Sequence, residues 1–221
     1  MEIQIDCDWS GTTKEKYFKL LSFLRKKIAS KKIKLSSTIR LHQIKFFKKT
    51  GVPPVDRGML MFYNVGEVAD ISTQNSILDL EIAKQYLENF DNYPLQLDLA
   101  LPIFSWGVLF RDGKMIKLIS GLREAELSDS TRFVNSSASR ILNFGSTFEV
   151  KKSTYLDGRY LYEGDQIRLE SVRLEVLEET AQLLKEHLFN EDLTISFYHL
   201  DTTTIKHFQY EKLQDICHFF Y

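Results

Sequence analysis

Segments that look like β-strands alternate with segments that look like helices along most of this chain. Residues 13–29 place apolar side chains at helical spacing, and they lie between two strand-like segments at 3–9 and 34–41. A strand, a helix and a second strand in this order are typical of a parallel sheet, because parallel strands need a long crossover connection. The alternation therefore predicts an α/β fold in which helices cover a parallel sheet.

Five segments carry the pattern expected for the core strands of such a sheet: 3–9, 34–41, 58–64, 95–101 and 193–199. Helical periodicity lies between or after them over 13–29, 76–90, 174–188 and 204–217. A closed (β/α)8 barrel contains eight strands and typically about 250 residues, whereas this chain has 221 residues. No linker or repeat divides it. We therefore predict a partial TIM-barrel-like fold in a single domain over 1–221, with an open sheet edge.

One stretch departs from this alternation. Over 121–170 the periodicity weakens, and residues 128–139 are rich in Ser and Asn, which is typical of an exposed loop. Turn signals lie at Asp112-Gly113 and at 163–165, each between short apolar segments. The sequence predicts an irregular, β-containing insertion near 121–170.

Charge and composition exclude several classes of function. The chain carries 29 basic and 30 acidic residues, so no global field attracts nucleic acid or an anionic membrane surface. No apolar run approaches the ~18 residues of a membrane span, and no signal-peptide pattern follows Met1. The two cysteines, Cys7 and Cys217, have neither metal-ligand nor disulfide spacing. With no Gly-rich phosphate loop and no Gly-x-Ser-x-Gly motif, we expect no cofactor, no metal and no serine-hydrolase chemistry.

Polar side chains gather where the predicted strands end. Asp6 and Asp8 close the first strand and point to the same side of it, because side chains two residues apart share a face. The carboxyl ends of parallel strands meet at one edge, which is where barrels place their sites. We therefore expect a common hollow lined by Asp6, Asp8, Arg40, His42, Tyr63 and Asn64.

These side chains have a functional and a structural interpretation. The two aspartates suit acid–base chemistry, or they accept hydrogen bonds from neighbouring strand ends. Arg40 forms an ion pair with Asp6 or Asp8, or it clamps a substrate. His42, which should share a strand face with Arg40, donates a proton to a ligand or binds a carbonyl. For Asp98, in the middle of the fourth strand, we expect a structural role and a pairing with Arg40.

Two tryptophans add surfaces that suit sugars. Trp9 ends the first predicted strand, and Trp106 follows the fourth. An indole ring packs favourably against the flat C–H faces of a sugar ring. The sequence thus predicts Trp9 and Trp106 as ligand-binding residues, with packing beneath the loops as the alternative.

Two of these strand ends resemble the chitinase-like glycoside hydrolase superfamily. The sequence Asp-Cys-Asp-Trp at 6–9 is similar to the Asp-x-Asp-Trp-Glu pattern that ends the fourth barrel strand in that group. The sequence Met-Phe-Tyr-Asn at 61–64 is similar to the Met-x-Tyr-Asn pattern that ends the sixth, and one further strand lies between them. The resemblance implies that the chain corresponds to barrel strands four to eight. It also implies a carbohydrate ligand at the strand ends, with Tyr63 helping to hold the reacting sugar.

A narrower resemblance covers about half the chain. The segments IQIDCDW, TIRLHQ, TGVPP, MLMFYN and ALPIFSW together look like a group of bacterial proteins from Bacteroidota whose barrel is related to glycosidases. That group consists mainly of exported or lipid-anchored proteins, so the resemblance implies such a location.

The residue pattern departs from the chitinase-like group at one position. Counting along Asp-x-Asp-Trp-Glu, the glutamate that protonates the glycosidic oxygen corresponds to Ser10. A hydroxyl is too weak an acid for this step near neutral pH. In a shifted register, Asp8 would act as the acid and Asp6 would assist it. Carbohydrate binding or processing is therefore our first hypothesis, and a degenerate glycoside hydrolase is its catalytic form.

Two other hypotheses follow from the same sequence. In one, the chain is a non-catalytic interaction or scaffold protein derived from a glycosidase barrel, and 121–170 is its partner-binding part. In the other, it is a truncated fragment without independent function. Serine at position 10, in place of the motif's glutamate, favours the non-catalytic protein. The absence of three barrel strands favours the truncated fragment.

Overall fold

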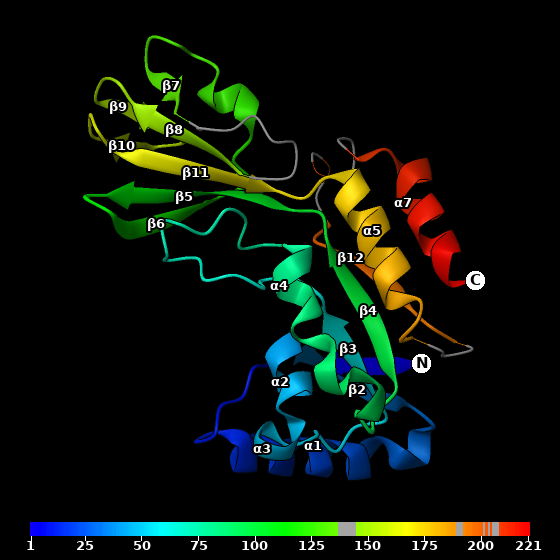
Figure 1. Ribbon diagram of the computed structural model, residues 1–221. Helices are drawn as coiled ribbons and strands as arrows, with labels where there is room; N and C mark the ends of the chain where they lie inside the picture. The colour runs from blue at the N-terminus through cyan, green and yellow to red at the C-terminus, as the bar shows by residue number, and fades with distance from the viewer. Residues whose placement is uncertain (137–144, 189–191, 201, 203, 205–207) are drawn as a thin grey trace.

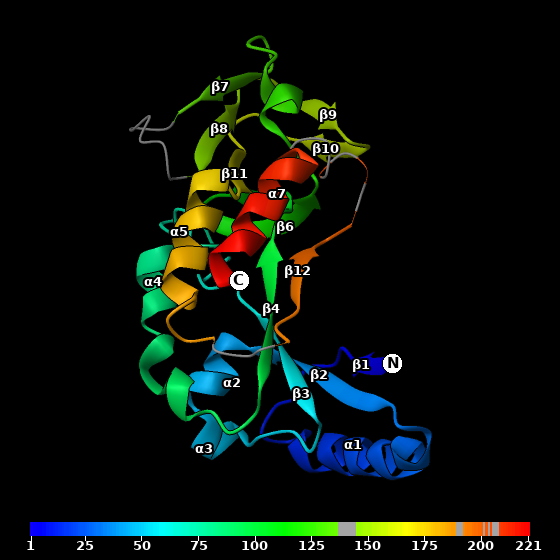
Figure 2. The same cartoon turned by 90° about the vertical axis from the view of Figure 1, so that its right-hand side faces the viewer.

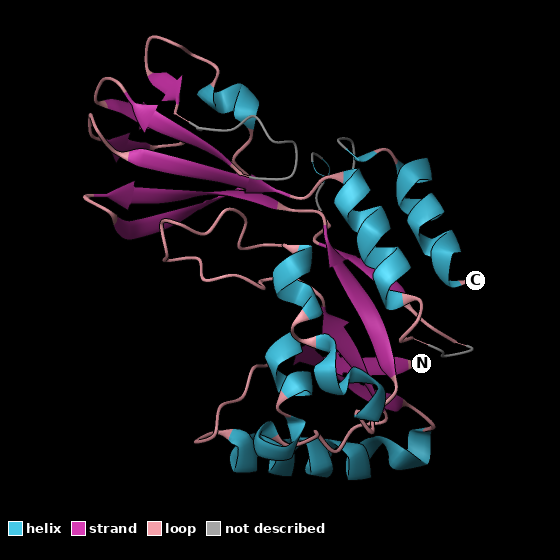
Figure 3. Cartoon of the chain, viewed as in Figure 1, coloured by secondary structure: helices cyan, strands magenta, loops and turns pink. Residues whose placement is uncertain are grey.

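Two five-stranded sheets, one parallel and one antiparallel, form the framework of the protein (Figure 1). The computed structural model describes residues 1–136, 145–188, 192–200, 202, 204 and 208–221. Most helices lie against the parallel sheet, and the antiparallel sheet extends away from them (Figure 3). The chain builds four strands of the parallel sheet, continues through the antiparallel sheet, and then returns to add the fifth parallel strand.

The parallel sheet has the strand order β1-β2-β3-β4-β12. Its strands are β1 (Glu2–Ile5), β2 (Lys34–Arg40), β3 (Arg57–Met61), β4 (Leu97–Pro102) and β12 (Ile195–Tyr198). All neighbouring pairs run parallel, and the sheet is curled (Figure 2). The five predicted core strands are thus confirmed. The first is shorter than the predicted 3–9, because the chain leaves the sheet after Ile5.

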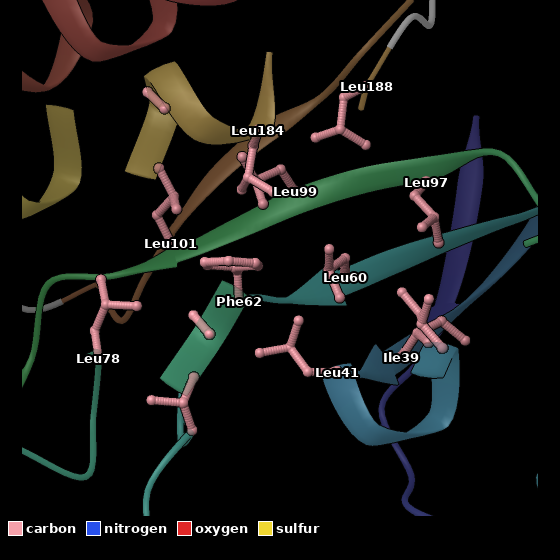
Figure 4. Close-up of a cluster of buried hydrophobic side chains, with 14 of the residues drawn as sticks. Ile39, Leu41, Leu60, Phe62, Leu78, Leu97, Leu99, Leu101, Leu184 and Leu188 are labelled. Carbon is pink, nitrogen blue, oxygen red and sulfur yellow. The ribbon is translucent and has the colours of Figure 1, made fainter. Parts of the chain in front are cut away.

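One face of the parallel sheet forms the main hydrophobic core. Ile39, Leu60 and Leu99, on three neighbouring strands, are fully buried and share this face (Figure 4). Figure 4 also shows Leu184 close to Leu99. The long helices that contribute to this core are α1 (Lys14–Ile28), α5 (Leu174–Leu184) and α7 (Tyr210–Cys217). Burial of each such side chain contributes about 1.5–3 kcal/mol, so this face joins the sheet to its helices.

Short helices link the strands. They are α2 (Leu41–Lys45), α3 (Phe47–Thr50), α4 (Leu80–Lys84) and the 3-10 turns η1 (Ala29–Lys31), η2 (Leu87–Asn92) and η3 (Glu124–Leu127), and a further 3-10 turn, η4 (His218–Phe220), follows α7. The single helix predicted over 76–90 is wrong: α4 begins after Asp79, whose carboxylate accepts hydrogen bonds from the amides of Glu81 and Ile82, and a 3-10 turn follows.

The last predicted helix is observed in part. Residues 210–217 of the predicted 204–217 form α7, and 205–207 lie outside the described residues. Within the described part of the chain, no helix is both long and apolar enough to span a membrane.

The antiparallel sheet has the order β6-β5-β11-β8-β7. Its strands are β5 (Ser105–Arg111), β6 (Lys114–Ser120), β7 (Phe133–Asn135), β8 (Ser146–Val150) and β11 (Gln166–Ser171), and a separate hairpin pairs β9 (Thr154–Leu156) with β10 (Arg159–Leu161). The predicted turn at Asp112-Gly113 is confirmed, since both residues have positive φ between β5 and β6.

The β content predicted for 121–170 is confirmed, since β7 to β10 and most of β11 lie there. The prediction that this part is irregular is wrong for β7, β8 and β11, which belong to a regular sheet, and that sheet already begins at Ser105. Part of the predicted loop over 128–139 forms the strand β7, and residues 137–139 lie outside the described residues.

The two faces of the antiparallel sheet are covered by different parts of the chain. On one face, Leu109, Ile119 and Ile167 form a second hydrophobic core with the hairpin residues Leu156 and Leu161. On the opposite face, Arg168 and Glu170 bind the loop between β3 and α4 through hydrogen bonds to Val68, Asp70 and Ser76. This loop starts from the carboxyl end of β3, so the antiparallel sheet lies next to the end of the parallel sheet where a barrel site is expected.

Candidate functional site

Polar side chains of the segment after β1 pair with side chains of β2 on the sheet face opposite the helices. The hydroxyl of Thr38 donates to Asp6 at 2.9 Å, and Nε of Arg40 donates to Asp8 at 2.7 Å. A second hydrogen bond joins Nη2 of Arg40 to the other oxygen of Asp8. Asp6 and Asp8 follow β1 directly, and they continue the register in which Ile5 is paired with Ser37, so they lie beside Thr38 and Arg40. The Asp8–Arg40 pair lies at the carboxyl ends of these strands.

The two predicted carboxylates are therefore in different situations. Both oxygens of Asp8 accept hydrogen bonds from Arg40. Of the two aspartates expected as partners of Arg40, it is therefore Asp8 that forms the ion pair. Asp6 uses one oxygen for Thr38 and has no second side-chain partner within the described part of the chain. Both aspartates are exposed, because β1 is the edge strand of the sheet. They lie at an open edge rather than inside a closed barrel mouth.

His42 does not lie on the strand face predicted for it. β2 ends at Arg40 and Leu41 begins α2, so the alternation of a strand does not continue to His42. Partial burial of the ring, and then the charge of Arg40, lower the pKa of His42, while Asp8 opposes this shift. At neutral pH the ring is therefore uncharged, which suits a hydrogen bond with a neutral ligand.

Aromatic rings form the other part of the strand ends. Tyr63, after β3, stacks on Tyr198 at the end of β12, with ring centroids 5.4 Å apart and planes 12° from parallel. Phe104 packs edge-on against both rings, at 5.8 Å and 5.7 Å. Burial, and then the neighbouring Tyr198, raise the pKa of Tyr63, so its hydroxyl stays protonated and can donate a hydrogen bond. Tyr198 remains 49% exposed at the surface of this cluster.

Trp106 extends the aromatic cluster from the antiparallel sheet. Its ring centroid lies 5.2 Å from that of Phe104, and its indole N–H donates to Glu170 at 2.9 Å. Glu170 is fully buried and also accepts hydrogen bonds from Ser76 and Arg168. The half-buried ring of Trp106 is therefore held in one orientation at the junction of the two sheets.

A small pocket lies beside α2 at the end of β3. Its lining includes four of the six side chains expected around the hollow, Arg40, His42, Tyr63 and Asn64. The pocket has a volume of about 70 Å³, whereas small-molecule pockets usually enclose about 300–1,000 Å³. A ligand of sugar size at this site must therefore lie mainly on the open surface around the pocket.

Trp9 lies in the core under α1 and not with these side chains. It is 7% exposed, its indole N–H donates to the carbonyl of Thr50 at 3.0 Å, and its ring stacks on Tyr17 at 5.5 Å. The prediction that Trp9 binds a ligand is therefore wrong. Its ring packs in the core and has almost no surface left for a ligand. Ser10 lies in the turn that begins α1, where its hydroxyl is 2.9 Å from that of Thr12.

Asp98 has a different partner from the one expected. It forms an ion pair with Arg57 on the neighbouring strand at 3.1 Å and accepts a hydrogen bond from the amide of Thr194 at 2.7 Å. Arg40 is opposite Met61, further along the strands, so the predicted pairing of Asp98 with Arg40 is wrong. Burial raises the pKa of Asp98, and the Thr194 amide and Arg57 oppose this shift.

Tyr198 belongs to the cluster although the sequence pattern did not single it out. It ends the last strand of the parallel sheet, so the rule that selected Tyr63 applies to it as well. Within the described residues, no group of three or more His, Cys, Asp or Glu side chains is placed to hold a metal ion.

The sequence matches no protein-family model and no curated protein. Solved structures nevertheless share its architecture. A chitinase from Chromobacterium violaceum is 12% identical with a TM-score of 0.55, over 93% of this chain and 65% of its own. The spore cortex-lytic enzyme SleL of Bacillus cereus is 14% identical with a TM-score of 0.58, over 100% of this chain and 48% of its own. The fold is that of chitinase-like glycoside hydrolases.

A third structure adds a bound ligand. A class V chitinase from Nicotiana tobaccum, solved in complex with NAG4, is 10% identical with a TM-score of 0.55, over 98% of this chain and 67% of its own. The chain thus spans about half to two thirds of the length of these three proteins. The likeness confirms the chitinase-like fold that the two strand-end motifs implied.

Proposed function

We propose that the protein binds carbohydrate at the carboxyl ends of its parallel strands. The observation that carries the proposal is the stacked pair of Tyr63 and Tyr198 in the same strand-end region as the ion pair of Asp8 and Arg40. Sugars present flat C–H faces, which pack on aromatic rings, and hydroxyl groups, which bind charged and amide side chains. The strand ends supply both kinds of surface within one cluster.

The charges at the site favour an uncharged ligand. Asp8 neutralises Arg40, His42 is uncharged at neutral pH, and Tyr63 keeps its proton. Apart from Asp6, whose carboxylate binds only the hydroxyl of Thr38 among the described side chains, a ligand therefore meets hydrogen-bond donors and acceptors without a strong net charge. One protein of this fold is known in complex with NAG4, and barrels place ligands at their strand carboxyl ends, which supports the same location here.

The bound sugar is not hydrolysed efficiently. Ser10 occupies the position of the glutamate in the resembled motif, and it lies in a turn with other hydroxyls. Asp8, the acid in the shifted register, has both oxygens occupied by Arg40. Asp6 keeps one oxygen without a side-chain partner within the described residues and is the remaining carboxylate for chemistry.

Binding can be tested by calorimetry with NAG4. We expect the wild-type protein to bind NAG4 and Tyr198→Ala to bind about tenfold more weakly, because one exposed stacking surface is lost. Tyr210→Ala is the matched control, since Tyr210 lies on α7 and is 68% exposed. No binding by the wild-type protein, or equal binding by Tyr198→Ala, contradicts the proposal.

Hydrolysis can be tested on the same ligand by separating the products after prolonged incubation. We expect no release of shorter sugars above the buffer control. Release that is lost in Asp6→Asn would show that this carboxylate supplies the proton, and it would contradict binding without turnover.

A further inference from the structure

A second aromatic surface lies on the hairpin β9–β10, at the outer end of the antiparallel sheet (Figures 1 and 2). It consists of Tyr155, Tyr160 and Tyr162, which we call the tyrosine strip. These side chains are 65%, 46% and 52% exposed, so each presents about half of its surface to solvent. We call Tyr63, Phe104, Trp106 and Tyr198 the strand-end cluster. The ring contacts that join these four residues do not include the tyrosine strip.

The hairpin register explains why the three rings share one face. Tyr155 is directly opposite Tyr160, and Tyr162 follows Tyr160 by two residues. Leu156 and Leu161, next to them in sequence, point the other way and are buried in the core of the antiparallel sheet. The hairpin therefore buries its leucines and exposes only tyrosines as large apolar side chains.

The strip is held rigidly. Neighbouring ring centroids are 5.0 Å apart, both between Tyr155 and Tyr160 and between Tyr160 and Tyr162. The guanidinium of Arg111 lies 4.2 Å from the ring centroid of Tyr162, and the buried carboxylate of Asp165 holds it by two hydrogen bonds of 2.7 Å and 2.8 Å. Asp165 also accepts the amide of Tyr162 at 2.8 Å. Side chains fixed in this way lose little conformational entropy when a ligand binds.

The charge at the strip is balanced, which favours an uncharged ligand. Asp165 neutralises Arg111, the cation that contacts the rings. Each tyrosine combines an apolar ring with a hydroxyl that donates and accepts hydrogen bonds. This is the chemistry of a neutral sugar, which offers C–H faces and hydroxyl groups together.

The exposed area of the tyrosine strip suits a sugar chain better than a protein partner. Three tyrosines, each about half exposed, offer roughly 250–400 Å² if one aromatic side chain presents about 150–250 Å². A stable protein–protein interface needs about 800 Å² from each partner. The area is therefore too small for a stable protein interface and suits a short stretch of polymer.

We infer that the tyrosine strip is a second carbohydrate-binding surface, which holds a neutral polysaccharide outside the strand-end cluster. The inference rests on the proposed function, because the ligand belongs to the same chemical class. The strip serves attachment to an extended polymer, whereas the strand ends bind a short sugar chain such as NAG4.

The inference is tested by binding to insoluble chitin, measured as depletion from solution, alongside calorimetry with soluble NAG4. We expect a triple variant with Tyr155→Ala, Tyr160→Ala and Tyr162→Ala to lose about tenfold or more of its chitin affinity, because three stacking surfaces are removed. Its binding of NAG4 at the strand ends should be unchanged, which also shows that it is folded. The single variant Tyr155→Ala should show a smaller loss, and Tyr210→Ala should show none.

The outcomes separate the two proposals. Chitin binding that persists in both tyrosine-strip variants, or is lost only in Tyr198→Ala, overturns the strip and leaves the strand-end site. Chitin binding that depends on the strip, without any binding of NAG4, supports the strip and contradicts the strand-end site. A wild-type protein that does not bind chitin overturns the strip.

Discussion

Each of the two sheets contains an arginine–carboxylate pair in which both side chains are buried. The two pairs differ in how many further hydrogen bonds they form with other parts of the chain. In the parallel sheet, Arg57 and Asp98 lie 3.1 Å apart with side chains 7% and 3% exposed. Asp98 also accepts the amide of Thr194, and Arg57 donates to the carbonyl of Asp192 at 3.1 Å. This pair fixes the segment that leads into β12.

The pair in the antiparallel sheet is more highly connected. Glu170 accepts from Nε of Arg168 at 2.6 Å, from the indole of Trp106, and from both the amide and the hydroxyl of Ser76 at 2.7 Å and 2.6 Å. Arg168 in turn donates to the carbonyls of Val68 and Asp70 at 2.9 Å and 2.7 Å. This pair fixes the loop after β3 and one ring of the strand-end cluster.

The difference shows where this protein uses buried charge. The face of the parallel sheet that packs on helices is apolar, and its attachment needs no ion pair. Both ion pairs lie where a loop distant in sequence must be fixed to a strand. Because buried charges are costly without full partners, the more connected pair should matter more for stability. It also binds a candidate-site residue directly, through the indole of Trp106.

The largest effect is expected from Glu170→Ala. It should lower the free energy of unfolding by about 3–5 kcal/mol, because the charge of Arg168 and the donors of Trp106 and Ser76 lose their acceptor in a buried place. Asp98→Ala should cost less, towards the lower end of that range, because fewer donors depend on it. Urea unfolding measures both. Glu149→Ala, on the exposed side of β8, is the control and should stay within about 0.5 kcal/mol of wild type. An Asp98→Ala effect larger than that of Glu170→Ala would reverse the comparison.

A second effect compares how tightly the two sheets pack around a glycine. A Cβ added at Gly58 in β3 would lie 2.8 Å from Cγ1 of Ile39 and 2.9 Å from Leu97, whereas one at Gly107 in β5 would lie 2.4 Å from the end of Leu122. Overpacking typically costs about 1–3 kcal/mol. Gly58→Ala should fall in this range, because two side chains must move. Gly107→Ala should cost less, because its one contact below 3.0 Å is with the far end of Leu122, and Ile167, at 3.1 Å, needs to shift only slightly. Thermal unfolding of the two variants gives the order, and equal or inverted losses would contradict it.

The smallest effect is a dependence on pH at the outer end of the antiparallel sheet. Burial alone would raise the pKa of Asp165, but the hydrogen bonds from Arg111 and from the amide of Tyr162 outweigh it and leave the pKa below its usual value. A carboxyl group with a lowered pKa in the folded state stabilises the fold above its unfolded-state pKa. This contribution is lost as the pH falls through the folded-state pKa.

Asp165→Asn should therefore reduce stability at neutral pH and remove part of the loss seen in acid. The effect should be modest, because Arg111 is 35% exposed and solvent screens the pair. Unfolding curves at a series of pH values from neutral to acidic test this, with the exposed Asp112→Asn as the control. An acid dependence identical to that of wild type would show that Asp165 does not contribute.

The parallel sheet could be predicted because its signals are local. Its strands are short and apolar, as expected where helices cover a parallel sheet, and α1 carries its own periodicity next to them. The hairpin turn at Asp112-Gly113 could be predicted for the same reason, but the order of the antiparallel sheet could not, because β5 also pairs with β11, which comes much later in the sequence. The residue pattern within a single strand does not indicate which distant strand pairs with it. The helix predicted over 76–90 failed for a similar reason, since the chain leaves helical geometry at Asn89 despite its apolar spacing.

The sequence by itself determined the α/β class, the five core strands and the gathering of polar side chains at their carboxyl ends, because parallel strands bring these ends to one edge whatever else the chain does. Only the tertiary structure decided which of these side chains meet. It pairs Arg40 with Asp8, buries Trp9 under α1, and stacks Tyr198 on Tyr63. Such contacts depend on strand register and on the curl of the sheet, and both are properties of the assembled fold.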